Sequence, residues 1–312
     1  MIWANLLHLS YNMWWDREAP ELEGYVSTIS AKPYLRFEKS LWDDLLVKMA
    51  DAGMNMVVID LGDAVRYASH PEIAVEGAWS VEQLREELAK MRAMGLEPIP
   101  KLNFSACHDA WLGPYSRMLS TPAYYKVCGD LIEEVCDIFD KPRFFHLGMD
   151  EENIGNQRHH LYVVIRQYEL WWHDLMFYVD HVEKSGVRAW VWSDYLWDHP
   201  DRFVERMPKS VLQSNWYYGA EFEPTQEPTT TYVNSYVELE KHGYDQIPTG
   251  SNWSSKDNFE STVRFCKQHV DPKRLLGFLQ TIWHPTLEEY RSLHLEAIDQ
   301  VKQAREWFEG RG

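Results

Sequence analysis

The sequence has few cysteines, and their spacing suits neither a metal site nor a disulfide. Four occur in 312 residues, at Cys107, Cys128, Cys136 and Cys266. Their spacing matches no metal-binding pattern. In a helix, Cys128 and Cys136 would lie about two turns apart, which is too far for a disulfide. We therefore predict free thiols in a reducing compartment and expect a cytoplasmic protein.

Basic residues are also scarce, and no segment suits a membrane. The formal net charge of −17 leaves no basic face for phosphate groups, so we expect neither nucleic acid nor an anionic membrane as a partner. No apolar run reaches the length that spans a bilayer, and the first residues lack the features of a signal peptide. No Gly-rich turn of the dinucleotide-binding type follows a predicted strand, which disfavours a doubly wound open sheet. We expect no cofactor.

Aromatic residues, in contrast, are abundant. The chain has 15 Trp and 17 Tyr, and many of them stand where predicted strands end. Flat amphipathic rings at such positions suit the less polar faces of sugars, although large aromatic residues also fill protein cores. The composition therefore favours a neutral or cationic small ligand, with a glycan or glycoside as the simplest choice.

Strand-like and helix-like segments alternate along the whole chain. Eight strands are predicted, at residues 2–9, 54–61, 97–104, 144–149, 187–193, 211–215, 246–251 and 275–281. Helices are predicted between them, for example at residues 41–52, 81–94, 123–139, 168–185 and 259–269. Eight such units are typical of a parallel (β/α)8 TIM barrel, although a doubly wound open sheet shares the alternation. We predict an α/β barrel with a single domain, residues 1–312.

Several of the connections that follow strands are long. They lie at residues 10–36, 62–80 and 152–167, and residues 221–231 form another predicted loop. In a barrel, such loops cover the active face, and long loops inside a compact domain are usually functional. We therefore expect the site at the carboxyl ends of the strands.

One predicted strand ends in three adjacent carboxylates. Residues 144–149 are mostly apolar, and Asp150, Glu151 and Glu152 follow directly. Because side chains alternate along a strand, His146 and Asp150 share one face, while Glu151 begins the loop above. Neighbouring Asp and Glu side chains can then reach one ligand. The alternative is a solvated acidic turn at the start of the next helix.

Other predicted strand ends also carry polar and aromatic residues. Carboxylates at the floor of an aromatic cage are what glycosidic cleavage requires. The candidate catalytic residues are Asp150 and Glu151. The candidate substrate-binding residues are His108, His146, Trp192, Asp194, Trp216, Tyr217, Trp253 and Trp283.

The acidic motif resembles that of the family 20 glycoside hydrolases, the β-N-acetylhexosaminidases. Their fourth strand ends in a His-x-Gly-Gly-Asp-Glu pattern, which is similar to His146-Leu147-Gly148-Met149-Asp150-Glu151. Residues 61–95 resemble the second strand–helix unit of that family, and residues 95–100 with His108 resemble its third strand. The aromatic positions of its sugar pocket are similar to Trp192 with Asp194, to Trp216 and to residues 277–283.

The resemblance implies an exo-acting glycoside hydrolase with a substrate-assisted, retaining mechanism and no metal. It implies that Asp150 orients the 2-acetamido group as this group attacks the anomeric carbon. Glu151 would protonate the departing oxygen and then deprotonate water. The chemistry of the residues agrees, because desolvation keeps an acid in an aromatic pocket partly protonated. His108 and His146 would orient Glu151, or they are core histidines with ordinary hydrogen bonds.

The sequence departs from the family pattern at several positions. Met149 replaces the second glycine of the motif, where a side chain would crowd the space below the sugar. No arginine stands on the first strand, where the family holds sugar hydroxyls. Asn252-Trp253 stands after the seventh strand, where the family has a tyrosine. Asn103 and His284 stand at two positions where the family has an acid.

Two other functions fit the same residues. A sugar isomerase or epimerase barrel would use a divalent metal held by His8, His108, Asp150 and Glu151. A non-catalytic barrel would bind a glycan without cleaving it, with Met149 as the mark of lost catalysis. The sugar, the linkage, the need for an acetamido group and the oligomeric state are left open by the sequence.

Overall fold

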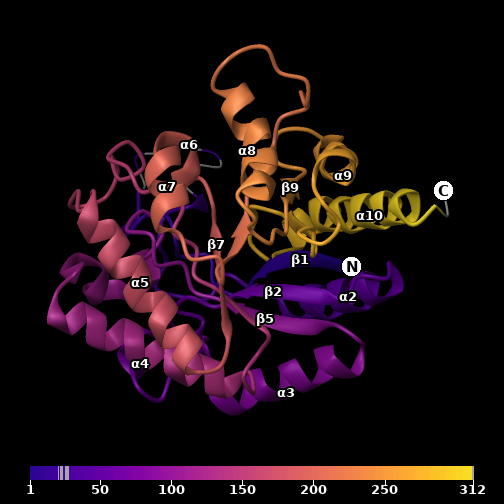
Figure 1. Ribbon diagram of the computed structural model, residues 1–312. Helices are drawn as coiled ribbons and strands as arrows, with labels where there is room; N and C mark the ends of the chain where they lie inside the picture. Colours follow the sequence, from indigo (N-terminus) through magenta and orange to yellow (C-terminus); the bar gives the residue numbers. More distant parts are fainter. Residues whose placement is uncertain (20, 22–23, 25–27, 311–312) are drawn as a thin grey trace.

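The centre of the protein is a parallel β-barrel (Figure 1). The computed structural model describes residues 1–19, 21, 24 and 28–310, so residues 20, 22–23 and 25–27 of the predicted loop at 10–36 lie outside the described residues. The barrel strands are β1 (Ile2–His8), β2 (Met56–Asp60), β5 (Glu97–Lys101), β6 (Phe144–His146), β7 (Arg188–Trp192), β8 (Leu212–Ser214), β9 (Thr249–Ser251) and β10 (Gly277–Thr281). Each of these strands falls inside a strand predicted from the sequence.

The strands close into a ring. They pair in parallel in the order β8-β7-β6-β5-β2-β1-β10-β9. Parallel bridges between Gln213 and Gln246 and between Trp216 and Thr249 join the two ends of this order. The backbone N–H of Ile247 also donates to the carbonyl oxygen of Gln213 at 2.9 Å. The predicted (β/α)8 barrel is confirmed, because a doubly wound open sheet would keep two free edges.

Side chains alternate between the inside and the outside of the barrel. In β1, Ile2, Ala4 and Leu6 belong to the inner apolar cluster, whereas Trp3 and Leu7 belong to the large core between strands and helices. The next inward positions toward the carboxyl ends are polar and buried, and they are His8, Asp60, Lys101 and His146. The barrel interior is therefore apolar below and polar at the end where the loops meet.

Helices cover the outside of the barrel (Figure 1). They are α2 (Lys39–Asp51), α3 (Val81–Ala93), α4 (Pro122–Ile138), α5 (Glu169–Lys184), α6 (Tyr195–Asp198), α7 (Pro200–Arg206), α8 (Thr229–Lys241), α9 (Asn258–His269) and α10 (Arg291–Phe308). The five helices predicted by residue number are confirmed to within two residues at each end. No helix in the described part of the chain is both long enough and apolar enough to span a bilayer.

The connections after the strands carry short elements of their own. Residues 62–80 include β3 (Val65–Arg66), η1 (Pro71–Ile73) and β4 (Trp79–Ser80), while η2 (Ala110–Met118) follows β5 and η3 (Glu288–Tyr290) precedes α10. The predicted loop at 221–231 is wrong in its last three residues, because α8 begins at Thr229. The three threonines at 229–231 were interpreted as loop residues, but they form the first turn of a helix. Val233, Tyr236 and Leu239 supply its buried face. In Figure 1, α8 and the loop before it rise above the rest of the barrel.

Candidate active site

A cavity of about 450 Å³ opens at the carboxyl ends of the strands. Two adjacent carboxylates, Asp150 and Glu151, enter it together. Its other lining residues are Met13, Trp14, Ile29, His108, Trp192, Trp216, Tyr217, Tyr218, Gly219, Tyr232, Trp253, Ser254 and Trp283. They come from the ends of all the barrel strands except β2, or from the segments that follow them. This is the end of a barrel at which enzymes carry their catalytic groups.

The backbone leaves β6 through a left-handed turn. Gly148, Met149 and Glu151 have φ angles of 71°, 76° and 54°. A side chain is excluded at Gly148, because its Cβ would stand 1.9 Å from the amide oxygen of Asn103. Met149 and Glu151 adopt a conformation that is rare for residues with side chains, so the surrounding contacts must hold them there. The predicted strand at 144–149 is therefore too long: it ends at His146, and the turn replaces the alternation.

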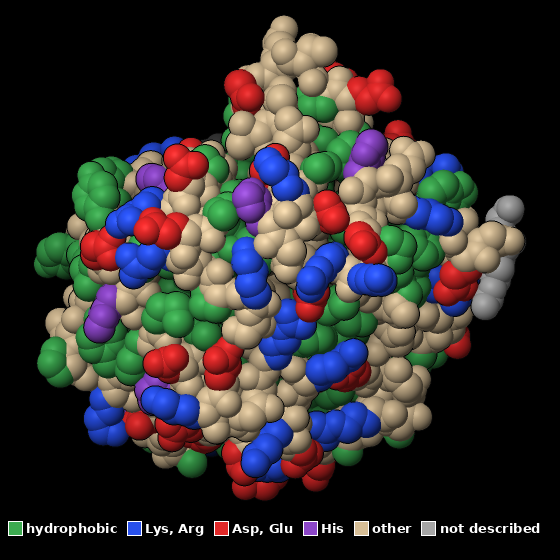
Figure 2. Space-filling view, in the orientation of Figure 1, with side chains coloured by type: hydrophobic (Ala, Val, Ile, Leu, Met, Phe, Trp, Pro, Cys, Tyr) green, Lys and Arg blue, Asp and Glu red, His purple; other side chains and the backbone are tan. Residues whose placement is uncertain are grey.

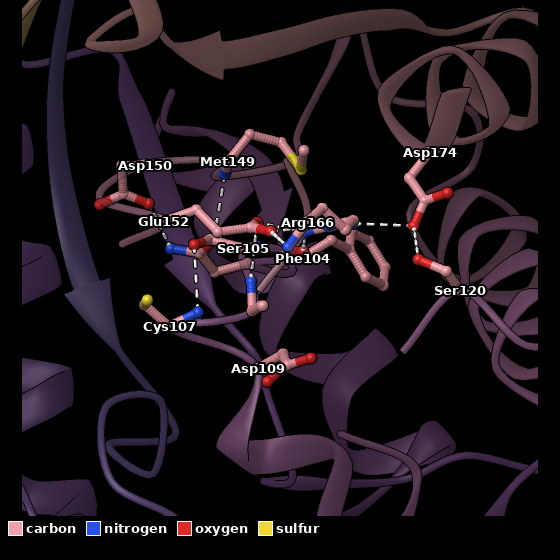
Figure 3. A network of polar contacts seen from close by, with 12 residues as sticks. Phe104, Ser105, Cys107, Asp109, Ser120, Met149, Asp150, Glu152, Arg166 and Asp174 are labelled. Atoms are coloured by element: carbon pink, nitrogen blue, oxygen red, sulfur yellow. Dashed lines mark hydrogen bonds and ion pairs between the residues drawn. The ribbon is translucent and has the colours of Figure 1, made fainter. Parts of the chain in front are cut away.

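Met149 does not narrow the cavity, contrary to the expectation that it crowds the sugar site. Its side chain is buried in the core and lines a neighbouring cavity instead. In Figure 3 the side chains of Met149 and Asp150 point in different directions. The left-handed turn thus places the methionine away from the space above Asp150.

Asp150 is buried and held in one orientation. Only 8% of its surface is exposed. Asn103 Nδ2 donates to Asp150 Oδ1 at 2.8 Å, while Asn103 Oδ1 accepts the backbone N–H groups of Ser105 and Met149 at 3.0 and 3.1 Å. Burial raises the pKa of Asp150 above 3.8, although the charge of His108 opposes this shift. Asn103, which stands where the family pattern has an acid, thus acts as a hydrogen-bond donor to Asp150.

His108 faces both acids. Its Nε2 lies 3.2 Å from Glu151 Oε2 and 3.4 Å from Asp150 Oδ2. Burial lowers the pKa of His108, but the charges of Asp150 and Glu151 outweigh burial and raise this pKa above 6.5. The side chain of Glu151 is 40% exposed, against 11% for Asp150. Glu151 is therefore the acid that an incoming group meets first.

Asp194 holds Glu151 from the side of the neighbouring cavity. Its Oδ2 accepts the backbone N–H of Glu151 at 2.8 Å, and Trp216 Nε1 donates to its Oδ1 at 3.4 Å. Burial, followed by the charge of Asp150, raises the pKa of Asp194 to about 8. Asp194 lines the neighbouring cavity and not the one that holds both acids. The structure thus places this predicted binding residue behind the acids.

Aromatic rings form the walls of the cavity. Trp192, Trp216, Tyr217, Trp253 and Trp283, all predicted from the sequence, line it. The Trp283 ring centroid lies 6.2 Å from that of Trp192 at an interplanar angle of 63°. Differently inclined rings of this kind can cover more than one face of a bound sugar.

His146 is a second predicted binding residue that does not line this cavity, and it lines neither of the two. It is fully buried, its ring centroid lies 4.3 Å from that of Trp192, and its Nδ1 accepts the N–H of Gly148 at 3.1 Å. Burial lowers the pKa of His146 well below 6.5, so the ring is neutral. His146 supports the wall and the turn and has no contact with Glu151 among the described interactions.

Three aromatic wall residues were not among the predicted substrate-binding residues: Trp14, Tyr218 and Tyr232. Tyr218 directly follows the predicted Tyr217, so its signal was present in the sequence. Its ring stacks on Trp216 with centroids 5.2 Å apart. Tyr232 lies in the first turn of α8, where the run of threonines gave no sign of a site.

The third acid of the motif, Glu152, binds a buried arginine (Figure 3). Arg166 donates to Glu152 through Nε at 2.9 Å and through Nη2 at 2.6 Å. The same guanidinium reaches Asp174 of α5 at 3.2 Å and the carbonyl oxygen of Phe104 at 2.6 Å. The side chain of Arg166 is fully buried. This network connects the loop at 152–167 to the barrel and to α5. The sequence around Arg166 did not predict it.

The metal set of the alternative hypothesis is only partly assembled. Among the residues that the structure describes, ligand atoms of His108, Asp150 and Glu151 lie within 4.8 Å of one another. His8 lies apart from them, with its Nδ1 3.4 Å from Asp60 Oδ2, which also accepts from Lys101 Nζ at 2.7 Å. The imidazole and the two carboxylates of this cluster are suitable ligands for a divalent metal. The two acids raise the pKa of His108, so a metal ion would have to displace the proton on its ring.

Comparisons with known proteins agree with the fold. No protein-family model matches the sequence, and no curated protein sequence matches it. The GH20 exo-β-N-acetylglucosaminidase from Vibrio harveyi, solved in complex with N-acetylglucosamine, is similar over 99% of this chain and 55% of that chain, with a TM-score of 0.65 and 16% identity. The β-N-acetylhexosaminidase from Bacteroides fragilis is similar over 99% of this chain and 71% of that chain, with a TM-score of 0.64 and 14% identity.

These likenesses confirm the resemblance at the level of the fold. A GH20 β-N-acetylhexosaminidase from Streptomyces coelicolor is similar over 96% of this chain and 64% of that chain, with a TM-score of 0.64 and 12% identity. This chain spans about half the length of the Vibrio harveyi enzyme, since the similarity covers 55% of that protein. The barrel implied by the acidic motif and the barrel observed are of the same type.

Replacing Arg166 should destabilise the protein. In Arg166→Met, Glu152 and Asp174 would remain as buried carboxylates without their cation, so we expect the free energy of unfolding to fall by about 3–5 kcal/mol. The control is Arg158→Met, an exposed position in the same loop, for which we expect a change within about 0.5 kcal/mol. Urea unfolding followed by circular dichroism measures both, and equal effects would contradict this role for Arg166.

Replacing Asp194 should change how stability depends on pH. Because its pKa in the folded protein lies above the unfolded value, the wild type loses stability as pH rises from about 4 to about 8. Asp194→Asn keeps an oxygen for the N–H of Glu151 and removes the charge, so we expect it to exceed the wild type in stability by about 1–3 kcal/mol at pH 9 and by less at pH 5.

Urea unfolding at both pH values measures this difference. Asp198→Asn, an exposed position in α6, is the control. An Asp194→Asn variant that is less stable than the wild type at pH 9 would show that the fold favours the ionised carboxylate.

Proposed function

We propose that this chain is an exo-acting glycoside hydrolase that resembles the β-N-acetylhexosaminidases and acts on a small glycan or glycoside containing an amino sugar. The observation that carries the proposal is the shared position of Asp150 and Glu151, which both face His108 in a cavity walled by Trp and Tyr. The volume of about 450 Å³ is within the range of small-ligand sites. The fold shared with GH20 enzymes supports the same reaction class.

The two acids have different environments, which suit two different roles. In the proposed reaction, the acetamido oxygen forms a bond to the anomeric carbon while the bond from this carbon to the leaving oxygen breaks. Asp150 orients the acetamido group and stabilises the positive charge that develops on it. Glu151 gives its proton to the leaving oxygen and later takes a proton from the water that opens the intermediate. The more exposed acid thus exchanges protons, and the buried acid stays in place.

His108 supports the proton transfer. Its pKa is raised by the two acids, so a cation is favoured beside them. When Glu151 has given up its proton, its carboxylate lies 3.2 Å from His108 Nε2, where a protonated ring stabilises it. His108 is therefore positioned to stabilise the carboxylate that proton transfer leaves on Glu151.

Tyr218 is the residue that we propose as the partner of the acetamido oxygen. Burial raises the pKa of its phenol, and the charges of Asp150 and Glu151 raise it further, so the hydroxyl keeps its proton near the acids. Tyr218 follows β8, which is the sixth strand of the barrel in chain order. The family pattern has a tyrosine after the seventh barrel strand, which is β9 here. A phenol from a neighbouring strand end would supply the same hydrogen bond.

The test separates proton donation from stabilisation of the acetamido group. We expect Glu151→Gln to lower kcat by about 10²–10⁴-fold on β-N-acetylglucosaminides with poor leaving groups, and by much less on 2,4-dinitrophenyl glycosides, whose leaving oxygen needs no proton. Asp150→Asn should lower kcat on both. Steady-state kinetics on the two substrates measures this pattern. If Glu151→Gln retained wild-type turnover on all substrates, Glu151 would not be the acid.

A second candidate function is favoured by the cluster of His108, Asp150 and Glu151, which has the donor types of a divalent-metal site in a sugar isomerase. The hydrolase requires no metal, so dialysis against a chelator should leave glycoside turnover unchanged. A sugar-isomerising activity that is lost in the chelator and recovered with Mn²⁺ or Mg²⁺ would favour the isomerase. Elemental analysis of the dialysed protein confirms that the metal has been removed.

Two further parts of the proposal concern the setting of the reaction. The four cysteines are free and buried, which supports work in a reducing compartment, the cytoplasm. We also propose that residues 1–312 form one catalytic domain, because the strand–helix units continue without interruption from β1 to α10.

A further inference from the structure

The loop after β6 and the start of α5 concentrate exposed apolar side chains. Of the 13 large hydrophobic residues that are exposed in the described chain, seven lie between residues 154 and 170. Their exposed fractions run from 38% to 77%. We name this set the apolar lip, and its members are Ile154, Leu161, Tyr162, Val163, Val164, Tyr168 and Leu170. Exposed apolar side chains concentrated in one segment mark a candidate binding surface.

Two buried residues flank four members of the lip, which are Leu161, Tyr162, Val163 and Val164. Gln157 is buried, and its side chain binds both backbone groups of Val164: Nε2 donates to the carbonyl oxygen at 2.8 Å and Oε1 accepts the N–H at 2.6 Å. Arg166 is buried in its ion network two residues later. The segment between Gln157 and Arg166 is thus held in a fixed shape with its apolar side chains outward.

The lip borders a second cavity of about 590 Å³. Two lip residues, Ile154 and Tyr168, line this cavity, and it shares Glu151, Trp216 and Tyr232 with the first one. Its other walls combine aromatic rings with polar side chains: the rings are Trp171, Tyr195 and Trp197, and the polar residues include Asn153, Asn156, Gln167, Asp198 and His199. Figure 2 shows hydrophobic side chains gathered at the left edge of the molecule, on the side of α5, α6 and α7.

Tyr168 stands at this cavity in a rare backbone conformation. Its φ and ψ are 53° and −127°, and it is the most exposed residue of the lip. Residues with side chains are costly to hold in this region, and such residues gather at ligand sites. Its strained backbone and outward ring suit a position at which a ligand covers the phenol.

Glu151 lines both cavities, and this decides what the second one receives. This step rests on the proposed function. A glycosidic oxygen that Glu151 protonates has the sugar ring on one side and the leaving group on the other. With the ring in the first cavity, the leaving group extends into the second cavity and toward the lip.

We propose that the preferred substrates are glycosides whose leaving group carries an apolar segment, an alkyl chain or an aryl group, which the second cavity and the apolar lip bind. Continuity of the lip with the cavity that contains Glu151 identifies the leaving group as the occupant. A second copy of the chain on the lip is an alternative that the experiment distinguishes.

The experiment uses alkyl β-N-acetylglucosaminides from methyl to octyl, below their micellar concentrations. We expect kcat/KM to rise by about two- to fourfold for each methylene group that the lip covers. In the double variant Ile154→Ser/Val163→Ser, the octyl-to-methyl ratio should fall. The control Val47→Ser/Met94→Ser removes two similarly exposed apolar side chains from another part of the surface and should keep the ratio of the wild type.

Binding of the thio-linked methyl and octyl analogues, measured by calorimetry, separates this inference from the proposed hydrolysis. Tighter binding of the octyl analogue without turnover of the oxygen glycosides would overturn the hydrolase and keep the apolar site. Turnover without dependence on chain length would overturn the apolar site alone, and binding of neither analogue would overturn both. Self-association in sedimentation that the double variant abolishes would assign the lip to a second copy and overturn the inference.

Discussion

The site depends on the contact between the side-chain amide of Asn103 and the turn that follows β6. The amide oxygen occupies the space where a side chain on residue 148 would stand, and it accepts the N–H of Met149. The amide nitrogen donates to Asp150. One planar group thus fixes the glycine, the turn and the buried acid together. The turn has a positive φ at two residues that bear side chains, Met149 and Glu151, which costs about 1–3 kcal/mol for each of them. The contact with Asn103 offsets this cost at Met149, and the bond from the N–H of Glu151 to Asp194 offsets it at Glu151.

Charge balance in the site follows from burial. Asp150 and Asp194 are both buried with raised pKa values, so the site does not favour three ionised carboxylates at once. His108 lies within 3.4 Å of Asp150 and Glu151, whereas Lys101 is bound by Asp60. With one cation facing the pair, a proton shared among these groups is favoured over full ionisation. The raised pKa of Asp194 favours a proton on this buried carboxyl near neutral pH, so the charge of His108 faces Asp150 and Glu151 alone.

The sequence predicted the barrel and most of the site because both follow from short-range patterns. Alternation of strands and helices located every barrel strand, and the strand ends located Asp150, Glu151, His108 and five of the aromatic walls. The rest required tertiary contacts. The end of β6 at His146 depends on Asn103, which lies 43 positions earlier in the chain. Arg166 and Gln157 look like ordinary loop residues, and only the folded chain shows that they are buried.

Three adjacent acids with nearly the same chemistry have three different environments. Asp150 points to a buried amide, Glu151 lines two cavities, and Glu152 faces inward to Arg166. A regular strand would have placed the first and third on one face and the second on the other. The left-handed turn breaks this rule, so Asp150 and Glu151 share a cavity although they are neighbours in sequence. The strain in the turn and the sharing of the cavity therefore have one cause. The ion network between Glu152 and the buried Arg166 stabilises the chain directly after the turn.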